Sequence, residues 1–285
     1  MKLTDLNAIR SLLKEFDAVP DKRYGQNFLI SERVVTNIAD GCGASPDDGV
    51  LEIGPGIGVL TEKLCERYKK VVSVEIDRKM ISILGKTMAD FDNFTLINED
   101  VLKVDLNKLL VEHFSGMKVT VCANLPYYIT SPIIMYLLES EAPIENVTVM
   151  IQKEVADRIT AKPGTEAYGS ITPVIKYYAE AERLFTVPAG CFYPAPKVDS
   201  AVVRMRLRRD PEAEPKDRDL MFDLIKYAFL QRRKTLINAL SSDKRFEKQA
   251  VSDAVCACGF DERIRGEALS LCDFRRLSDA LSSQL

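Results

Sequence analysis

The sequence predicts an α/β fold, in which a mostly parallel sheet carries helices on both faces and a small all-α domain follows. Three observations support this prediction. Apolar strand-like runs alternate with helical patterns from about residue 50 to 180, as expected where helices connect parallel strands. One strand runs directly into a glycine-rich turn at 54–58. From Asp219 onward the apolar residues recur only at helical spacing.

The chain can bury a substantial core. It has 285 residues, of which 46% are hydrophobic, and this length allows one large domain or two. We expect a first domain at 1–209, with an N-terminal helical extension at 1–20, and a second domain at 216–285. The polar, proline-bearing stretch 210–215 between them is the expected linker.

The elements of the first domain follow from the apolar pattern. An amphipathic helix is expected at 3–16, followed by a loop at 18–24. Helices are also expected after the glycine turn, at 153–160, and from Ser131, which would cap a helix with Pro132 in its first turn. The expected strands lie at 50–53, 71–77, 94–97, 118–123, 147–152, 179–187 and 201–207.

The glycine turn contains Gly54, Gly56 and Gly58, and glycines let a backbone turn sharply and approach a ligand closely. A dinucleotide-binding turn has the pattern G-x-G-x-x-G, but its last position here is Val59. Glu52, two residues before the first glycine, favours a cationic ligand and would repel a pyrophosphate.

Two further acids follow the next two strands. Glu75 lies roughly 20 residues beyond the glycine turn, where an acidic residue binds ribose hydroxyls in nucleotide-binding folds, and Asp100 follows the third strand. S-adenosylmethionine, a sulfonium cation on an adenosine, is a ligand that fits this set of residues. The alternative is a generic strand–turn–helix with surface acids.

The tetrapeptide Asn124-Leu125-Pro126-Tyr127 follows the strand at 118–123 and can hold a planar amino group. The Asn124 side-chain oxygen can accept one amino proton, and the Leu125 carbonyl, exposed where Pro126 bends the chain, can accept the other. The Tyr127 ring can stack on the base that carries the amine. An ordinary turn is the alternative interpretation, since Asn and Pro are common turn residues.

Composition argues against several classes of protein. No stretch approaches the ~20 apolar residues that a transmembrane helix needs, and charged residues near the N-terminus interrupt any secretory signal. Seven scattered cysteines without a C-x-x-C pair, together with a single histidine, give no expectation of a metal site. These are traits of a cytoplasmic protein.

Basic residues are concentrated locally although the net charge is −3. The segment 226–248, whose apolar residues recur at helical spacing, has seven basic residues against two acidic ones, and four arginines lie between 204 and 209. Each cluster alone could be an ordinary solvated surface. Both clusters beside a base-binding motif favour a nucleic-acid partner.

Several distinctive motifs lie along the chain: YGQNFL at 24–29, LEIGPG at 51–56, VEID at 74–77, ED at 99–100, NLPYYI at 124–129, QKEVA at 152–156 and FYPAPKVDS at 192–200. With these motifs the sequence resembles the small-subunit ribosomal RNA adenine dimethyltransferases, the bacterial 16S enzymes that modify two adjacent adenosines in a hairpin loop near the 3′ end of the RNA. The resemblance runs nearly end to end, and its first and last motifs are the most specific.

The resemblance implies a Rossmann-like class I methyltransferase sheet, S-adenosylmethionine as cofactor, and 16S rRNA in a small subunit or its precursor as partner. It implies that Phe192 faces Tyr127 across the target adenine, although a loop anchor in the core is the alternative for Phe192. A monomer is expected. The implied cofactor-binding residues are Asn27, Leu29, Gly54, Gly56, Glu75, Asp100 and Asn124, and the expected RNA contacts are Lys197, Arg232, Arg233 and Lys234.

Other functions stay open at this point. A large-subunit ribosomal RNA adenine methyltransferase of the macrolide-resistance type would share the fold, and a ribosome-assembly factor could keep the fold and act mainly by binding. A dinucleotide oxidoreductase is disfavoured by Val59. Methylation of protein or DNA amines would use the same tetrapeptide chemistry, and only the flanking motifs argue against it.

Overall fold

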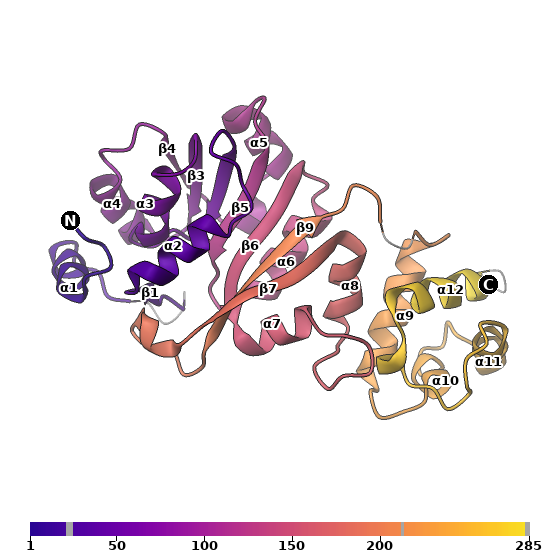
Figure 1. Ribbon diagram of the computed structural model, residues 1–285. Helices are drawn as coiled ribbons and strands as arrows, with labels where there is room; N and C mark the ends of the chain where they lie inside the picture. The colour runs from indigo at the N-terminus through magenta and orange to yellow at the C-terminus, as the bar shows by residue number, and fades with distance from the viewer. Residues whose placement is uncertain (21–24, 212–213, 283–285) are drawn as a thin grey trace. The chain divides into compact units, whose positions relative to one another are not determined.

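A seven-stranded mixed sheet forms the centre of the N-terminal part of the chain (Figure 1). The computed structural model describes residues 1–20, 25–211 and 214–282, so Tyr24 of the first motif and residues 212–213 of the expected linker lie outside the described residues. The strand order is β4-β3-β2-β5-β6-β9-β7. The strands are β2 (Gly49–Ile53), β3 (Lys70–Glu75), β4 (Phe94–Asn98), β5 (Val119–Asn124), β6 (Ile144–Gln152), β7 (Ala179–Val187) and β9 (Ser200–Leu207).

The expected strands are confirmed with small shifts at their ends. Strands β4, β3, β2, β5 and β6 are parallel neighbours, and β9 runs antiparallel to β6. Leu51 in the middle of β2 lies opposite Val72 on one side and Val121 on the other. The chain leaves β2 toward β3 and returns on the other side as β5, and open α/β sheets bind ligands at the carboxyl ends of the strands beside such a reversal.

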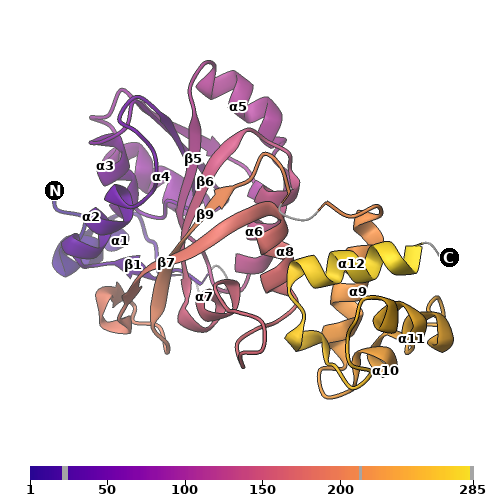
Figure 2. The ribbon, with the colours of Figure 1, turned by 45° about the vertical axis from the view of Figure 1, so that its right-hand side comes forward.

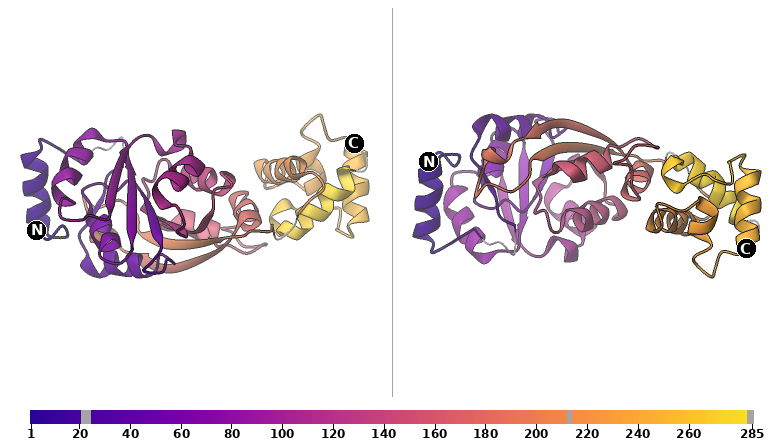
Figure 3. Two further views of the ribbon diagram at one scale, coloured as in Figure 1. Left: turned by 90° about the horizontal axis from the view of Figure 1, so that it is seen from above. Right: turned by 90° about the horizontal axis from the view of Figure 1, so that it is seen from below.

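Helices cover both faces of this sheet, as the views from above and below show (Figure 3). Aspartates begin several of them: the carboxylates of Asp5, Asp77 and Asp105 accept backbone N–H bonds from the first turns of α1, α4 and α5. In chain order before β7, the helices are α1 (Leu6–Glu15), α2 (Glu32–Asp40), α3 (Val59–Cys65), α4 (Arg78–Thr87), α5 (Leu106–Phe114), α6 (Thr130–Glu139), α7 (Lys153–Ile159) and α8 (Ile171–Tyr178); α8 belongs to the C-terminal unit described below.

The start of α6 differs from the expectation. The cap residue is Ile129, not Ser131. The hydroxyl of Thr130 donates to the Pro126 carbonyl at 3.0 Å, and the Ile129 N–H donates to the same carbonyl at 3.2 Å. The helix therefore begins as a direct continuation of the turn after the tetrapeptide.

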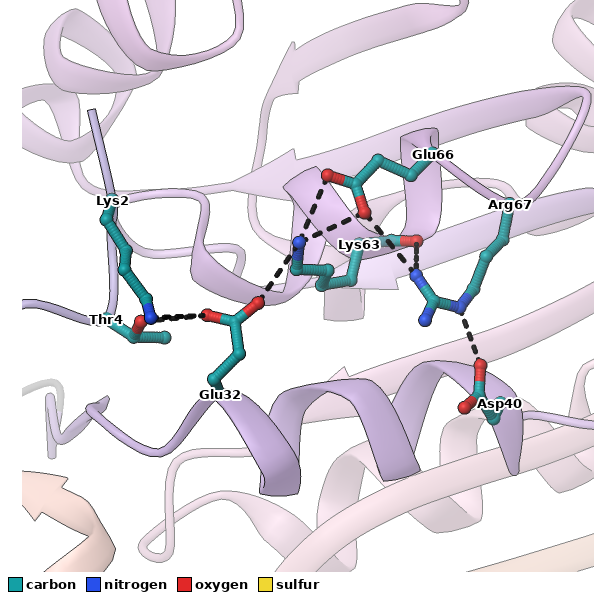
Figure 4. Close-up of polar contacts among 7 residues, drawn as sticks. All are labelled: Lys2, Thr4, Glu32, Asp40, Lys63, Glu66 and Arg67. Atoms are coloured by element: carbon teal, nitrogen blue, oxygen red, sulfur yellow. Dashed lines mark hydrogen bonds and ion pairs between the residues drawn. The ribbon is translucent and has the colours of Figure 1, made fainter.

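An ion-pair network joins the N-terminal segment and α2 to α3, the helix that follows the glycine turn (Figure 4). Glu32 accepts a hydrogen bond from the Thr4 hydroxyl at 2.9 Å and pairs with Lys63 at 3.2 Å. The Thr4 hydrogen bond is the largest cause that lowers the pKa of Glu32. Arg67 pairs with Asp40 at 2.6 Å. Each pair is partly exposed, so we expect each to contribute at most about 1 kcal/mol to the stability of the fold.

The contacts divide the chain into two units, residues 1–156 with 182–207 and residues 157–181 with 208–285. This grouping differs from the expected division at 209 and 216, because 157–181 joins the C-terminal unit. Two side chains explain the difference. The ring of Tyr177 meets that of Phe222 edge-on at 5.3 Å, and the Tyr168 hydroxyl donates to the Leu269 carbonyl at 2.7 Å.

The C-terminal part is helical, as predicted, with α9 (Arg218–Leu230), α10 (Leu236–Leu240), α11 (Lys248–Ala257) and α12 (Leu271–Ser282) around their own core (Figure 2). One expectation needs correction: residues 232–234 lie in a turn between α9 and α10, not on a helix face. The helix ends because Gln231 leaves the helical conformation, and the Lys234 N–H closes the turn on the Gln231 carbonyl at 2.8 Å. No helix of the described residues is long and apolar enough to cross a membrane.

Candidate active site

A cavity of about 250 Å³ opens at the carboxyl ends of β2, β3 and β5. It collects residues that are far apart in the sequence, because parallel strands end at the same edge of the sheet. All the expected cofactor-binding residues and the whole tetrapeptide line it: Asn27, Leu29, Gly54, Gly56, Glu75, Asp100, Asn124, Leu125, Pro126 and Tyr127.

The glycine turn shapes one wall of this cavity. Gly54 has φ +67°, a conformation that strains other residues, and a Cβ built there would meet nothing within 4 Å. Its N–H donates to the Val74 carbonyl at 3.0 Å, which ties the turn to β3. Gly58 has φ +93°, and a Cβ there would lie 2.9 Å from the Met88 methyl. The turn thus leaves open space at Gly54 and packs closely against α4 at Gly58.

The Glu75 carboxylate is held by backbone donors at the end of β3. One oxygen accepts from the N–H groups of Ile76 and Asp77 at 2.9 and 2.8 Å, and the other accepts from Gly56 at 3.3 Å. Burial raises the pKa of Glu75, and these three N–H bonds oppose that rise. The donors orient an acidic acceptor that lines the cavity and could accept from vicinal hydroxyls.

Asp100 lies beside an apolar part of the cavity that the sequence analysis missed. One of its carboxylate oxygens accepts from the Leu102 N–H at 3.1 Å, while Val101 and Ile76 supply neighbouring apolar surface. Ile76 is 46% exposed, which is unusual for a large aliphatic side chain directly after a buried strand. The position of Ile76 directly after Glu75, at the carboxyl end of β3, is the sequence signal that could have predicted its place in the cavity.

Glu52 is buried beneath the cavity, with 1% of its surface exposed. Its carboxyl oxygen Oε2 accepts from the hydroxyls of Thr61 and Ser73, both at 2.7 Å. Burial raises the pKa of Glu52 to about 7, the two hydroxyls lower it, and the charge of Glu75 adds to the rise. The group therefore gains or loses its charge near neutral pH.

This raised pKa predicts a pH-dependent stability. Between its usual value of 4.5 and about 7, the folded protein keeps a proton that the unfolded chain has released, so stability falls as pH rises through this window. Across this window the free energy of unfolding should fall by as much as about 3 kcal/mol because of Glu52. Urea unfolding from pH 4.5 to 8 measures it: the free energy of unfolding of wild type relative to Glu52→Gln should fall with pH. Parallel curves would contradict the assignment.

The Asn124 amide is oriented by the segment before β1. Its Nδ2 donates to the Asn27 carbonyl at 3.2 Å, which leaves Oδ1 as the acceptor atom of the amide. Leu125 is buried and donates its N–H to the Met150 carbonyl at 3.1 Å. Among the described residues no hydrogen bond to the Leu125 carbonyl is seen. Two acceptors at consecutive residues can therefore hold one amino group.

The two tyrosines after Pro126 have different surroundings. Tyr127 is partly buried, its hydroxyl is 2.7 Å from the Ser200 hydroxyl, and burial raises its pKa. This contact fixes the ring as a wall of the cavity. Tyr128 lines the same cavity with 58% of its surface exposed.

Phe192 does not lie where the resemblance implies. It is 3% exposed and belongs to the hydrophobic core, and the described residues that line the cavity do not include it. The reason is a two-stranded antiparallel sheet of β1 (Phe28–Leu29) and β8 (Phe192–Tyr193), in which Phe192 pairs with Leu29. In this structure its ring packs as the loop anchor that was the alternative interpretation. No observation tests a second aromatic wall at Phe192 with RNA bound, so that role stays a prediction.

The expected RNA contacts are all exposed, but Arg232 is engaged within its own unit. Its guanidinium pairs with Glu267 at 2.7 Å and donates to the Glu166 carbonyl at 2.7 Å. No ion pair of Lys197, Arg233 or Lys234 is seen within the described part of the chain. In that part there is also no group of three or more His, Cys, Asp or Glu that could hold a metal.

The model of the ribosomal RNA adenine dimethylase family matches residues 20–257. The chain belongs to this family. It is similar to ribosomal RNA small subunit methyltransferase A of Lachnoclostridium phytofermentans, with 45% identity over 96% of each chain. The protein of the same name from Geobacillus thermodenitrificans is 48% identical over 91% of this chain and 90% of its own length.

Two solved structures share the family's fold. The dimethyladenosine transferase of Plasmodium falciparum has a TM-score of 0.71 and 27% identity over 88% of this chain and 95% of its own. The 23S rRNA methyltransferase ErmE has a TM-score of 0.70 and 27% identity over 90% of this chain and 100% of its own. The expected class I methyltransferase fold is confirmed.

S-adenosylmethionine is the cofactor of the family, and the residues of the cavity fit it. Gly54 leaves room where a side chain would intrude. Glu75 offers an oriented acidic acceptor for ribose hydroxyls, and Asp100 with Val101 and Ile76 offers a polar edge beside apolar surface for an adenine.

Proposed function

We propose that this protein transfers methyl groups from S-adenosylmethionine to the exocyclic amines of two adjacent adenosines in the 3′-terminal hairpin loop of 16S rRNA, giving dimethyladenosines. The observation that carries the proposal is that the glycine turn, Glu75 and Asn124 line one cavity. An electrophile and an amine can thus be held side by side. Relatives at 43–48% identity that are named ribosomal RNA small subunit methyltransferase A support the small subunit as the target.

The chemistry needs orientation of a poor nucleophile, because the lone pair of an adenine amine is delocalised into the ring. When bound, the cofactor supplies an electrophilic methyl group. Asn124 Oδ1 and the Leu125 carbonyl accept the two amine protons and favour a more pyramidal nitrogen, while the Tyr127 ring stacks on the base. No side-chain base is needed, since the methylated ammonium is acidic and can release its proton to water.

The target adenine must leave its stack to reach the cavity, which costs less in a loop than in a duplex. Primer extension on both ribosomal RNAs tests the choice of target, because dimethylated adenines stop the polymerase. We expect new stops only near the 3′ end of the small-subunit RNA. Stops in the large-subunit RNA would instead favour the large-subunit alternative; ErmE, a 23S rRNA methyltransferase, is similar to this chain at the lower identity of 27%.

We also propose that the protein acts as a cytoplasmic monomer on the small subunit or its precursor, with the residues after the 210–215 linker binding RNA. Lys197, Arg233 and Lys234 would contact phosphates, since they are exposed basic side chains. Arg232 would mainly support the turn that presents its two neighbours, because its guanidinium is bound to Glu267.

A double substitution, Arg233→Ala with Lys234→Ala, should weaken binding to small subunits about 5- to 50-fold. It should also reduce the slope of log affinity against log salt by about 2, since each phosphate contact contributes roughly 0.9. Filter binding across salt concentrations measures both effects. Arg232→Ala should instead lower the Tm, and an unchanged salt slope in the double variant would refute the proposed phosphate contacts.

A further inference from the structure

Tyr128 is an exposed aromatic side chain at the edge of the active-site cavity. Its exposed fraction is 58%, whereas Tyr127 is partly buried. Both tyrosines line the cavity that contains Asn124. An exposed aromatic ring beside a binding site offers a flat face on which a base can stack.

The backbone that carries Tyr128 is held in place. The turn before α6 is closed by two hydrogen bonds to the Pro126 carbonyl, from the Ile129 N–H at 3.2 Å and the Thr130 hydroxyl at 3.0 Å. Gly25 packs on the same turn: a Cβ built on it would lie 3.7 Å from Cδ1 of Tyr128 and 3.8 Å from Cβ of Pro126. A turn held in this way presents the Tyr128 ring from a fixed backbone position, so little backbone freedom is lost when a ligand stacks on the ring.

We propose that the ring of Tyr128 stacks on the nucleobase adjacent to the target adenine, an inference that rests on the proposed function. The two target adenosines are neighbours in the RNA, so moving one into the cavity removes a stacking partner from the other. Tyr128 follows Tyr127 directly in the chain and lines the same cavity, so its exposed ring can replace that partner. Tyr127 holds the reacting base, and Tyr128 is a positioning residue for the base beside it.

This role predicts an effect on RNA recognition that depends on the neighbouring base. With small subunits from an unmethylated strain, Tyr128→Ala should lower kcat/KM about 10- to 100-fold, mainly through KM, because base–aromatic stacking has that strength. Tyr128→Phe keeps the ring and should stay within about twofold of wild type. The affinity for S-adenosylmethionine should be unchanged in both variants. Val111→Ala, which truncates another exposed apolar side chain, in α5, is the matched control.

Subunits that carry uridine in place of one of the two adenosines provide the decisive comparison. The remaining adenosine is then the only target, and its neighbour is a weaker stacking base. The ratio of wild type to Tyr128→Ala in kcat/KM should shrink to a few-fold on these subunits. An equal ratio on both kinds of subunit, or a matching loss of cofactor affinity, would overturn the proposal.

Binding without methyl transfer separates this proposal from the proposed function. If wild type transferred no methyl group to either adenosine, the proposed function would fail. The stacking contact could still be measured, by comparing the affinities of wild type and Tyr128→Ala for the two kinds of subunit. The contact is supported if Tyr128→Ala binds more weakly than wild type only to subunits that carry both adenosines. Equal binding of the two proteins to those subunits overturns it.

Discussion

Asn124→Ala should slow methyl transfer by about 100- to 1,000-fold, the range seen when one preorganised hydrogen-bonding group is removed from a reacting centre. The Asn124 Nδ2 is bound to the Asn27 carbonyl, so the lost atom that matters for chemistry is Oδ1. Without it the Leu125 carbonyl accepts one amine proton and the other has no acceptor. Single-turnover transfer of labelled methyl to unmethylated small subunits measures the effect.

Cofactor affinity should change only a few-fold in this variant, because Asn124 is one of many residues that line the cavity. Asn107→Ala is the matched control. Asn107 is an exposed residue of α5, and its side-chain amide donates to the Ser140 carbonyl at 3.2 Å. Near-normal turnover by Asn124→Ala would remove Asn124 from the mechanism. A parallel loss of cofactor binding would show that its role is cofactor binding.

Glu75→Ala should weaken S-adenosylmethionine binding about 100-fold. Hydrogen bonds to a charged group contribute about 1.5–3 kcal/mol each, and the carboxylate is expected to accept from the ribose hydroxyls. The variant also removes the acceptor of the Gly56, Ile76 and Asp77 N–H groups, so the turn loses support as well. Isothermal titration calorimetry gives the dissociation constant directly.

Saturating cofactor should restore much of the turnover in Glu75→Ala, because the residue acts on binding and not on the amine. Glu75→Gln keeps the shape of the side chain and should show a smaller loss of affinity. Glu112→Ala, an exposed glutamate on α5, controls for the loss of an acidic charge. Unchanged affinity in Glu75→Ala would exclude the ribose contact.

The sheet and most of the cavity could be predicted because each depends on local patterns. Val71 and Val72 lie in a continuous apolar run, as buried parallel strands require. Gly54 and Glu75 follow such runs, so their place at the carboxyl edge is set once the strands are recognised. The order of the strands then brings Asn124 to the same edge.

The features that were missed depend on tertiary packing. Phe192 lies in the core because β8 pairs with the two-residue strand β1, which is too short to leave a periodic signal. Residues 232–234 lie in a turn because the helix stops at Gln231, where the sequence has no Gly or Pro to mark the end. The exposure of Tyr128 likewise is set by the folded turn after Pro126 and leaves no pattern in the sequence.

Transfer of labelled methyl groups to small subunits from an unmethylated strain, followed by mapping of the modified nucleotides, tests the central claim most directly. We predict two methyl groups on each of two adjacent adenosines in the 3′-terminal hairpin loop of 16S rRNA, and no label on large subunits. Label on large-subunit RNA, on other nucleotides, or on neither RNA would contradict the account.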